Sequence, residues 1–149
     1  MNPILSIAVI SDTHNHVPEA LPQILSEADE IWHLGDVCSP EVLSSIEALG
    51  KPMSVVQGNM DVPFTWRERI LNERHGHRFF LQHYPPSRPE SDVDAILHGH
   101  LHVPVNDRLE GTKVLSPGAI TGPRNDSTAG FAWLRFYEES SWTWDRVEL

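Results

Sequence analysis

The sequence lacks the features of disulfide-stabilised, membrane-spanning and secreted proteins. It contains a single cysteine, Cys38, so no internal disulfide can form, which fits a reducing cytoplasm. No apolar run is long enough to span a bilayer, and the segment 1–3 opens without the basic and apolar regions of a secretory signal. We therefore expect a cytoplasmic protein that has no membrane partner.

Positive charge is scarce as well. The chain of 149 residues has 11 lysines and arginines against 21 aspartates and glutamates, a formal net charge of −10. Because nucleic-acid backbones are bound by clustered Lys and Arg, this balance argues against general nucleic-acid binding. A small anionic substrate is still compatible with it, since bound divalent cations can reverse the field inside a site.

Apolar residues make up 40% of the chain, enough for the core of one globular domain over residues 1–149. In the first part of the chain, apolar runs alternate with helical patterns. This alternation predicts parallel strands at 4–10, 31–34 and 53–56, separated by helices at 18–28 and 39–50. The second part predicts a strand at 93–97 and hairpins that pair 70–71 with 78–81, 103–105 with 114–115, and 131–136 with 142–144.

Polar side chains follow each predicted strand of the first part. Asp12 and His14 follow the first strand, Asp36 the second and Asn59 the third. Ligands bind at the carboxyl edge of parallel strands in open α/β sheets, so we expect these side chains to lie together. A turn or a helix N-cap is the alternative for Asp12 on its own, since aspartate favours such positions.

Histidines follow the later strands. His83 ends the second arm of the first hairpin, and His98, His100 and His102 follow the strand at 93–97. If that strand continued, the last three would project from one face. Imidazole is the commonest side-chain metal ligand. A histidine-rich surface loop is the alternative for the cluster taken alone.

The strand-end groups together predict a metal centre. Seven side chains offer oxygen or imidazole donors and no thiolate: Asp12, His14, Asp36, Asn59, His83, His100 and His102. This mixture suits Mn, Fe, Co, Ni or Zn better than Ca or Mg, which prefer all-oxygen shells. Seven donors exceed one tetrahedral site, and a carboxylate can bridge two metals. We therefore expect two divalent transition-metal ions.

The blocks that carry these residues resemble the signature of the calcineurin-like metallophosphoesterases. The matching blocks are Asp12-x-His14, Gly35-Asp36, Gly58-Asn59-x-Asp61, His83 and Gly99-His100-x-His102. The chain length and the later Ser116-Pro117-Gly118-Ala119 and Pro123-Arg124 resemble the small single-domain phosphodiesterase branch. The resemblance implies an α/β fold, an αββα four-layer sandwich of two mixed β-sheets flanked by helices.

The resemblance also implies a ligand assignment. Asp12, His14 and His102 would hold one metal ion, and Asp36 would bridge the two ions. The remaining ligands, Asn59, His83 and His100, would hold the second. Manganese is the first candidate, with nickel, iron, cobalt or zinc as alternatives.

The implied activity is hydrolysis of a small or nucleotide-like phosphoester, most simply a phosphodiester, by a metal-bound hydroxide. Many relatives carry a histidine after the Asn59 equivalent that protonates the leaving group, but Met60 stands here and cannot transfer a proton. We predict Asp61 as the catalytic acid, with His16 or the substrate itself as alternatives. Arg124 is the predicted substrate-binding residue because a guanidinium suits phosphate oxygens, although an ordinary surface arginine is the alternative.

The departures from the family pattern are also compatible with a protein that has no catalytic activity. A eukaryotic retromer subunit that resembles this branch serves as a binding scaffold. Met60 favours this alternative, as do Ser116 and Ala119, which replace the usual Asn and Ser. The intact set of seven metal ligands opposes it.

Overall fold

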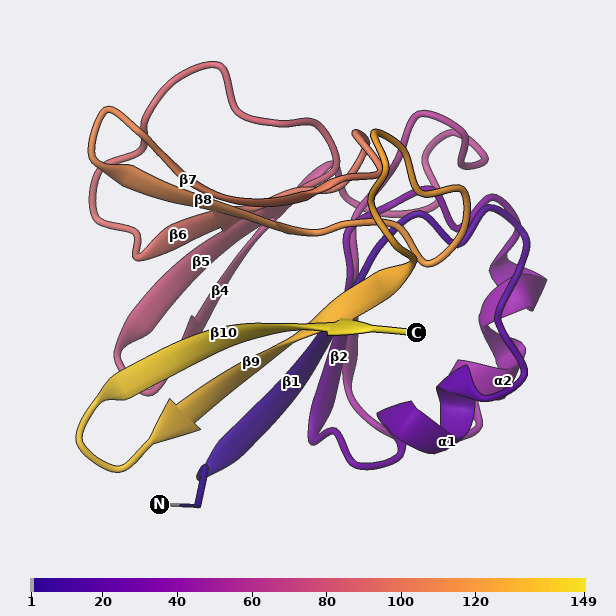
Figure 1. The fold of residues 1–149 in the computed structure, drawn as a ribbon, viewed down its shortest axis with the longest axis horizontal. Helices are drawn as coiled ribbons and strands as arrows, with labels where there is room; N and C mark the ends of the chain where they lie inside the picture. Colours follow the sequence, from indigo (N-terminus) through magenta and orange to yellow (C-terminus); the bar gives the residue numbers. More distant parts are fainter. Residues whose placement is uncertain (1) are drawn as a thin grey trace.

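The structure is a computed structural model that describes residues 2–149. Two five-stranded mixed sheets pack face to face (Figure 1). In the first sheet β1, β2 and β3 are parallel, as predicted, and β9 and β10 extend the sheet by antiparallel pairing. Its strands, in spatial order, are β10 (Ser141–Glu148), β9 (Gly130–Tyr137), β1 (Leu5–Ile10), β2 (Glu30–His33) and β3 (Met53–Val55).

The second sheet is built from the middle of the chain. Its three inner strands, β5, β6 and β8, are parallel, and an antiparallel strand closes each edge. The predicted hairpins are confirmed as β4–β5, β7–β8 and β9–β10. The strands, in spatial order, are β4 (Arg69–Arg74), β5 (His77–Gln82), β6 (Ala95–Leu97), β8 (Thr112–Pro117) and β7 (Pro104–Leu109).

Strand β1 is buried on both faces, which explains its near-continuous apolar sequence. Ile7 and Val9 face the second sheet and join a buried cluster that includes Phe79. Ala8 and Ile10 face the opposite way and join a cluster formed with the helices. The strand end that carries Asp12 is thereby held between two packed layers.

The helical segments are shorter than the predicted ranges 18–28 and 39–50. They are α1 (Leu21–Leu25), the 3₁₀ segment η1 (Pro40–Leu43) and α2 (Ser44–Glu47). Helix α1 starts after Ala20, which offers no side-chain cap, and at its end the Ser26 hydroxyl donates to the Gln23 carbonyl. Missing caps and local side-chain bonds both disfavour extension of a helix. None of the helices in residues 2–149 is long and apolar enough to cross a membrane.

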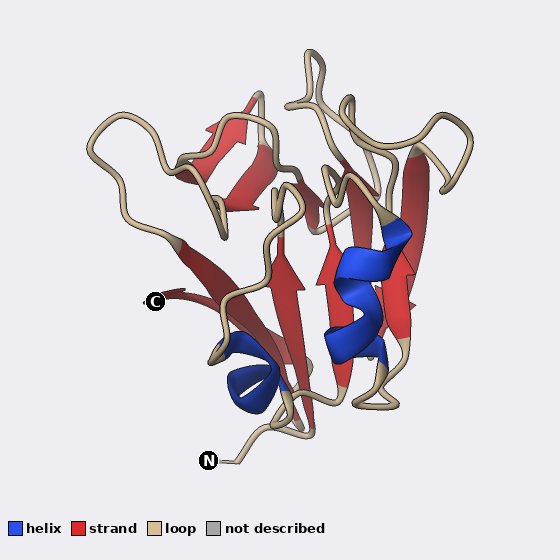
Figure 2. Ribbon diagram, turned by 90° about the vertical axis from the view of Figure 1, so that its right-hand side faces the viewer, coloured by secondary structure: helices blue, strands red, loops and turns tan. Residues whose placement is uncertain are grey.

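The expected two-sheet sandwich is confirmed, but its expected fourth layer is not found. The helical segments all lie on the outer side of the first sheet (Figure 2), and no helix between residues 2 and 149 covers the second. The connection from β5 to β6 contains Pro85, Pro86 and Pro89. Proline lacks the N–H that a helix interior requires, so this connection crosses as an irregular loop.

Candidate metal centre

The seven predicted ligand residues meet at one edge of the sandwich. They lie on the loops that follow β1, β2, β3, β5 and β6. One group consists of Asp12, His14, Asp36 and His102, each of which offers a donor atom within 4.8 Å of the others. Within this group, the His102 Nε2 lies 3.0 Å from the His14 Nε2 and 3.3 Å from the Asp12 Oδ1.

The other predicted ligands form a second group next to the first. The Asn59 Oδ1 lies 2.9 Å from the His83 Nε2 and 3.1 Å from the His100 Nδ1. Asp36 stands between the groups, because its Oδ2 lies 3.3 Å from the His83 Nε2 and 3.5 Å from the His14 Nε2. All seven residues are thus brought together, and Asp36 is within reach of both groups.

The backbone at this edge is strained. A positive φ is uncommon for residues other than glycine, and such strain gathers at functional sites. Backbone bonds hold the loops in this conformation: the Asp12 N–H donates to the Gly35 carbonyl, and the His14 N–H to the Asp36 carbonyl. Five of the seven ligand residues have a left-handed φ between 46° and 73°: Asp12, His14, Asp36, His100 and His102.

Two glycines in the motifs allow the loops to touch. A Cβ on Gly99 would overlap the Ser11 Oγ, and a Cβ on Gly58 would overlap the backbone N and the Oδ1 of Asp36. Only glycine permits such close approach. The glycines beside the polar strand ends therefore let neighbouring loops bring their ligands together.

Two histidines are oriented by backbone carbonyls. The His83 Nδ1 donates to the Leu34 carbonyl at 2.8 Å, and the His102 Nδ1 donates to the Gly122 carbonyl at 2.7 Å. This leaves the Nε2 lone pair of each ring directed at the centre. Metal-binding histidines are commonly held in this way by a bond from the other ring nitrogen.

One buried atom shows that the donor set fits a cation. The Asp12 Oδ2 accepts the Ser11 hydroxyl at 2.6 Å, but within the described chain the buried Asp12 Oδ1 has no hydrogen-bond partner. An unsatisfied buried polar atom is costly and requires an explanation. A divalent cation would satisfy this oxygen together with the Nε2 atoms of His14 and His102.

The pKa values of Asp36 and His100 are shifted in the direction that favours cation binding, although nearby carboxylates raise the pKa of His83. Burial alone would raise the pKa of Asp36, but the neighbouring His83 and the Met60 N–H, which donates to the Asp36 Oδ1, outweigh burial and lower it. Burial and the neighbouring His83 lower the pKa of His100, which keeps this imidazole neutral. Metal ions require a deprotonated carboxylate and a neutral imidazole, which these two shifts favour.

Residues 5–139 match the family model of the calcineurin-like phosphoesterase superfamily domain. The chain belongs to this family. A probable metallophosphoesterase of Methanothermobacter thermautotrophicus is 36% identical over an alignment 137 positions long, and the match covers 79% of this chain and 78% of that protein. A phosphodiesterase of Methanocaldococcus jannaschii is 26% identical over an alignment 142 positions long, and the match covers 79% of this chain and 86% of that protein.

Solved structures show the same fold. The crystal structure of Vps29 from Entamoeba histolytica complexed with Zn²⁺ has a TM-score of 0.75 and 19% identity. The match covers 96% of this chain and 98% of that one. The calcineurin-like fold expected from the sequence is therefore confirmed.

His33 lies behind the calcineurin-like ligand loops. Its Nε2 lies 3.1 Å from the Thr13 Oγ1, and its Nδ1 accepts the Gly35 N–H at 3.1 Å. These bonds connect the loop of Asp12 and His14 with the loop of Asp36. Burial lowers the pKa of His33 to about 3, so the ring stays neutral.

The strand at 93–97 does not continue into the histidine motif, so the condition under which His98, His100 and His102 would project from one face is not met. Strand β6 ends at Leu97, and the left-handed residues His100 and His102 turn the chain away from strand geometry. His98 is buried with its Nδ1 2.8 Å from the Gly99 carbonyl oxygen.

Asp61 is predicted as the catalytic acid, and in the structure its carboxylate is bonded to backbone N–H groups. Its Oδ2 accepts the N–H groups of Asp36 and Gly58, at 3.0 and 2.7 Å, and its Oδ1 accepts that of Cys38 at 2.6 Å. A carboxylate that accepts three backbone N–H groups fixes the conformation of both loops. This geometry argues against the predicted role of Asp61 as proton donor and gives it a positioning role.

The other predicted groups lie at the surface. Arg124 is exposed, and its backbone N–H donates to the His102 carbonyl at 3.0 Å, so its loop borders the centre. Contact between its guanidinium and substrate stays a prediction. His16 is exposed, and Met60 contacts the centre through its N–H, which donates to the Asp36 Oδ1 at 2.8 Å.

Several positioning groups had not been singled out from the sequence. Ser11 stands next to Asp12, which is the only signal that could have drawn attention to it. The carbonyls of Leu34 and Gly122 orient two ligands, yet a backbone group leaves no mark on residue type.

Proposed function

We propose that this protein is a dinuclear metal-dependent phosphodiesterase that hydrolyses a small or nucleotide-like phosphoester. The observation that carries this proposal is the buried Asp12 Oδ1, which has no hydrogen-bond partner among residues 2–149 and faces imidazole nitrogens of the first ligand group. The position of Asp36 between both groups supports a second ion. Membership of the calcineurin-like family supplies the reaction class.

Each group of ligands would hold one ion. Asp12, His14 and His102 would hold the first, the second would bind Asn59, His83 and His100, and Asp36 would bind both. We propose manganese, with nickel, iron, cobalt or zinc as alternatives for this mixed oxygen and imidazole set. When bound, the two cations would supply an activated water and neutralise charge on the phosphate oxygens.

The protein orients the predicted ligands through its backbone. At position 60, however, it offers no acid that could protonate the leaving group. The carbonyls of Leu34 and Gly122 direct two imidazoles inward, and Asp61 fixes the loop of Asp36. Met60 cannot donate a proton, and its side chain is 60% exposed at this edge. We therefore propose substrates whose leaving groups depart without protonation.

The test is hydrolysis of bis(p-nitrophenyl) phosphate by manganese- or nickel-loaded protein. His100→Ala removes a ligand of the second group, so its kcat/KM should fall by more than the 10–100-fold typical of an outer-shell partner. The matched control is His75→Ala, because His75 is exposed and lies outside the centre. A His100→Ala protein as active as the wild type would contradict the proposal.

A non-catalytic scaffold is the second candidate. Apolar side chains on the connection from β3 to β4 are exposed next to the centre, notably Met60 and Phe64. Gentle purification followed by elemental analysis separates the two candidates. Bound metal with turnover supports the enzyme, and absence of both supports the scaffold.

A further inference from the structure

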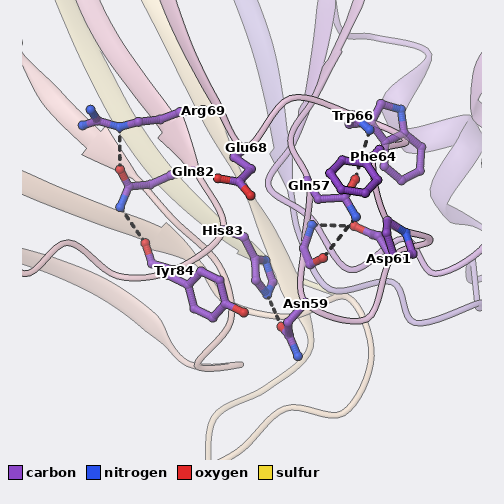
Figure 3. Close-up of a pocket in the computed structure, with 12 residues that line it drawn as sticks. Gln57, Asn59, Asp61, Phe64, Trp66, Glu68, Arg69, Gln82, His83 and Tyr84 are labelled. Carbon is purple, nitrogen blue, oxygen red and sulfur yellow. Dashed lines mark hydrogen bonds between the residues drawn. The ribbon is translucent and has the colours of Figure 1, made fainter.

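A cavity of about 480 Å³ opens beside the second ligand group (Figure 3). Asn59 and His83 line one end of it, so the cavity is continuous with the metal centre. Its size is that of sites for small organic ligands. A group attached to a phosphate at the centre would therefore extend into this space. The remaining walls include Gln57, Phe64, Trp66, Glu68, Gln82 and Tyr84.

Phe64 forms one side of the cavity and is not part of the core. Its side chain is 98% exposed, and its φ of 63° is a left-handed value that bulky residues rarely adopt. Tyr84 lies on the other side in Figure 3, with its ring centroid 4.8 Å from that of His100. The chain thus holds an apolar ring in solvent on a strained backbone, at the wall of a cavity.

The polar side chains that line the cavity differ in whether their hydrogen-bonding groups already have partners in the protein. Gln57 accepts the Trp66 N–H and donates to the Val62 carbonyl. Gln82 accepts from the Arg69 Nε and donates to the Tyr84 carbonyl. Both side-chain amides therefore already accept one hydrogen bond and donate another within the protein.

Glu68 is different. The residue is exposed, and among residues 2–149 its carboxylate has no hydrogen bond or ion pair, so it is free to accept from a ligand; it points into the cavity between Gln57 and Gln82 (Figure 3). A carboxylate can only accept hydrogen bonds. The group that enters this cavity should therefore combine a flat apolar face with N–H donors on its edge.

We propose that the cavity is a subsite for the nucleobase of the substrate, with guanine as the preferred base. The base would stack on Phe64, as bases stack on aromatic side chains in other proteins. Its N1–H and 2-amino groups would donate to the two oxygens of Glu68. Adenine and cytosine offer one donor group to such a carboxylate, so they should bind less well. This inference rests on the proposed function, because it places the phosphate at the metal centre.

The kinetic test uses p-nitrophenyl diesters that share one leaving group. Their second alcohols are guanosine (5′-hydroxyl), inosine (5′-hydroxyl), which lacks the 2-amino group, and methanol. For the manganese-loaded wild type, kcat/KM should fall in that order. Phe64→Ala should lower the values for both nucleoside esters about tenfold more than the value for the methyl ester, as loss of one stacking contact predicts. Glu68→Gln should remove the preference for guanosine over inosine.

Two variants serve as matched controls. Leu71→Ala removes an exposed apolar side chain from β4, away from the cavity, and Glu139→Gln removes an exposed carboxylate from the turn between β9 and β10. Neither should change any of the three values. A methyl ester hydrolysed as well as the guanosine ester would overturn the subsite. A preference for p-nitrophenyl phosphorylcholine that depends on Phe64 and Glu68 would overturn the nucleobase assignment and show that the cavity binds a quaternary ammonium group.

A binding experiment keeps this inference separate from the proposed function. Guanosine monophosphate is titrated into ¹⁵N-labelled wild-type protein and the Phe64→Ala variant, and NMR shifts are followed. Shifts should concentrate at the Phe64 and Glu68 amides and the Trp66 indole, and they should be lost in the variant. If no ester is hydrolysed with any metal, the proposed function fails, but such shifts would still support the subsite. Their absence would overturn it.

Discussion

Asp61→Asn tests whether this carboxylate positions the loops or donates a proton. The wild-type side chain accepts three backbone N–H groups, from Asp36, Cys38 and Gly58. An asparagine has one acceptor oxygen, so at best it keeps the two bonds made by the Asp61 Oδ2. Its NH₂ group would then face the Cys38 N–H, which would lose its acceptor.

The magnitude follows from these bonds. One buried N–H without a partner costs about 1–3 kcal/mol, and two bonds that change from a charged to a neutral acceptor each weaken by about 1 kcal/mol. We expect the free energy of unfolding to fall by about 3–5 kcal/mol, which corresponds to a melting temperature lower by roughly 10 °C for a chain of this size. Manganese affinity should fall as well, because the loop of Asp36 loses its support.

The assay combines urea unfolding, calorimetric manganese titration and hydrolysis of diesters with aryl and alkyl leaving groups. Asp145→Asn is the control, since Asp145 is exposed on β10. A positioning role predicts equal relative losses for both kinds of leaving group. A variant with wild-type stability and metal affinity, whose loss is confined to alkyl leaving groups, would refute this reasoning and restore Asp61 as the acid.

Two further predictions concern a buried and an exposed side chain. Burial lowers the pKa of His33 from its ordinary 6.5 to about 3, so between these pH values the unfolded chain binds a proton that the folded chain does not. Stability should therefore fall as the pH drops below 6.5, by about 1.4 kcal/mol per unit from this group. In urea unfolding, His33→Gln should lose about 2 kcal/mol less than the wild type between pH 7 and pH 5, and equal losses would contradict the prediction. Met60→His would place an imidazole next to the centre, so kcat for alkyl leaving groups should rise at least tenfold more than kcat for aryl ones. An equal change for both would show that the imidazole donates no proton.

Much of the sheet architecture could be predicted because β patterns and turns are local. The apolar run before Asp12 and the polar turns of the hairpins each indicate their own strand. The helices were harder to predict, because caps and side-chain bonds near Ala20 and Ser26 decide their length. The missing fourth layer follows from the proline-rich connection between β5 and β6.

The sequence identifies which residues are candidate metal ligands, but it does not show how their side chains are oriented. That orientation comes from the structure. All seven residues predicted as ligands converge at one edge of the sandwich. The orientation of the histidine motif could not be predicted, because the chain leaves strand geometry after Leu97. The role of Asp61 depends on the N–H groups of Asp36 and Cys38, which lie on a loop distant in the sequence, so no local pattern reveals it. The cavity beside Tyr84 likewise depends on how the connection from β3 to β4 lies against β5.

The number of metal ions bound per chain decides whether the seven predicted ligand residues form a dinuclear centre. The wild type and Asp36→Asn are stripped of metal, titrated with manganese by calorimetry and measured by elemental analysis after gel filtration. We expect two equivalents for the wild type and no more than one for the variant, because Asp36 lies between the two groups. A wild type that retains no manganese, or a variant that retains both equivalents, would contradict this expectation.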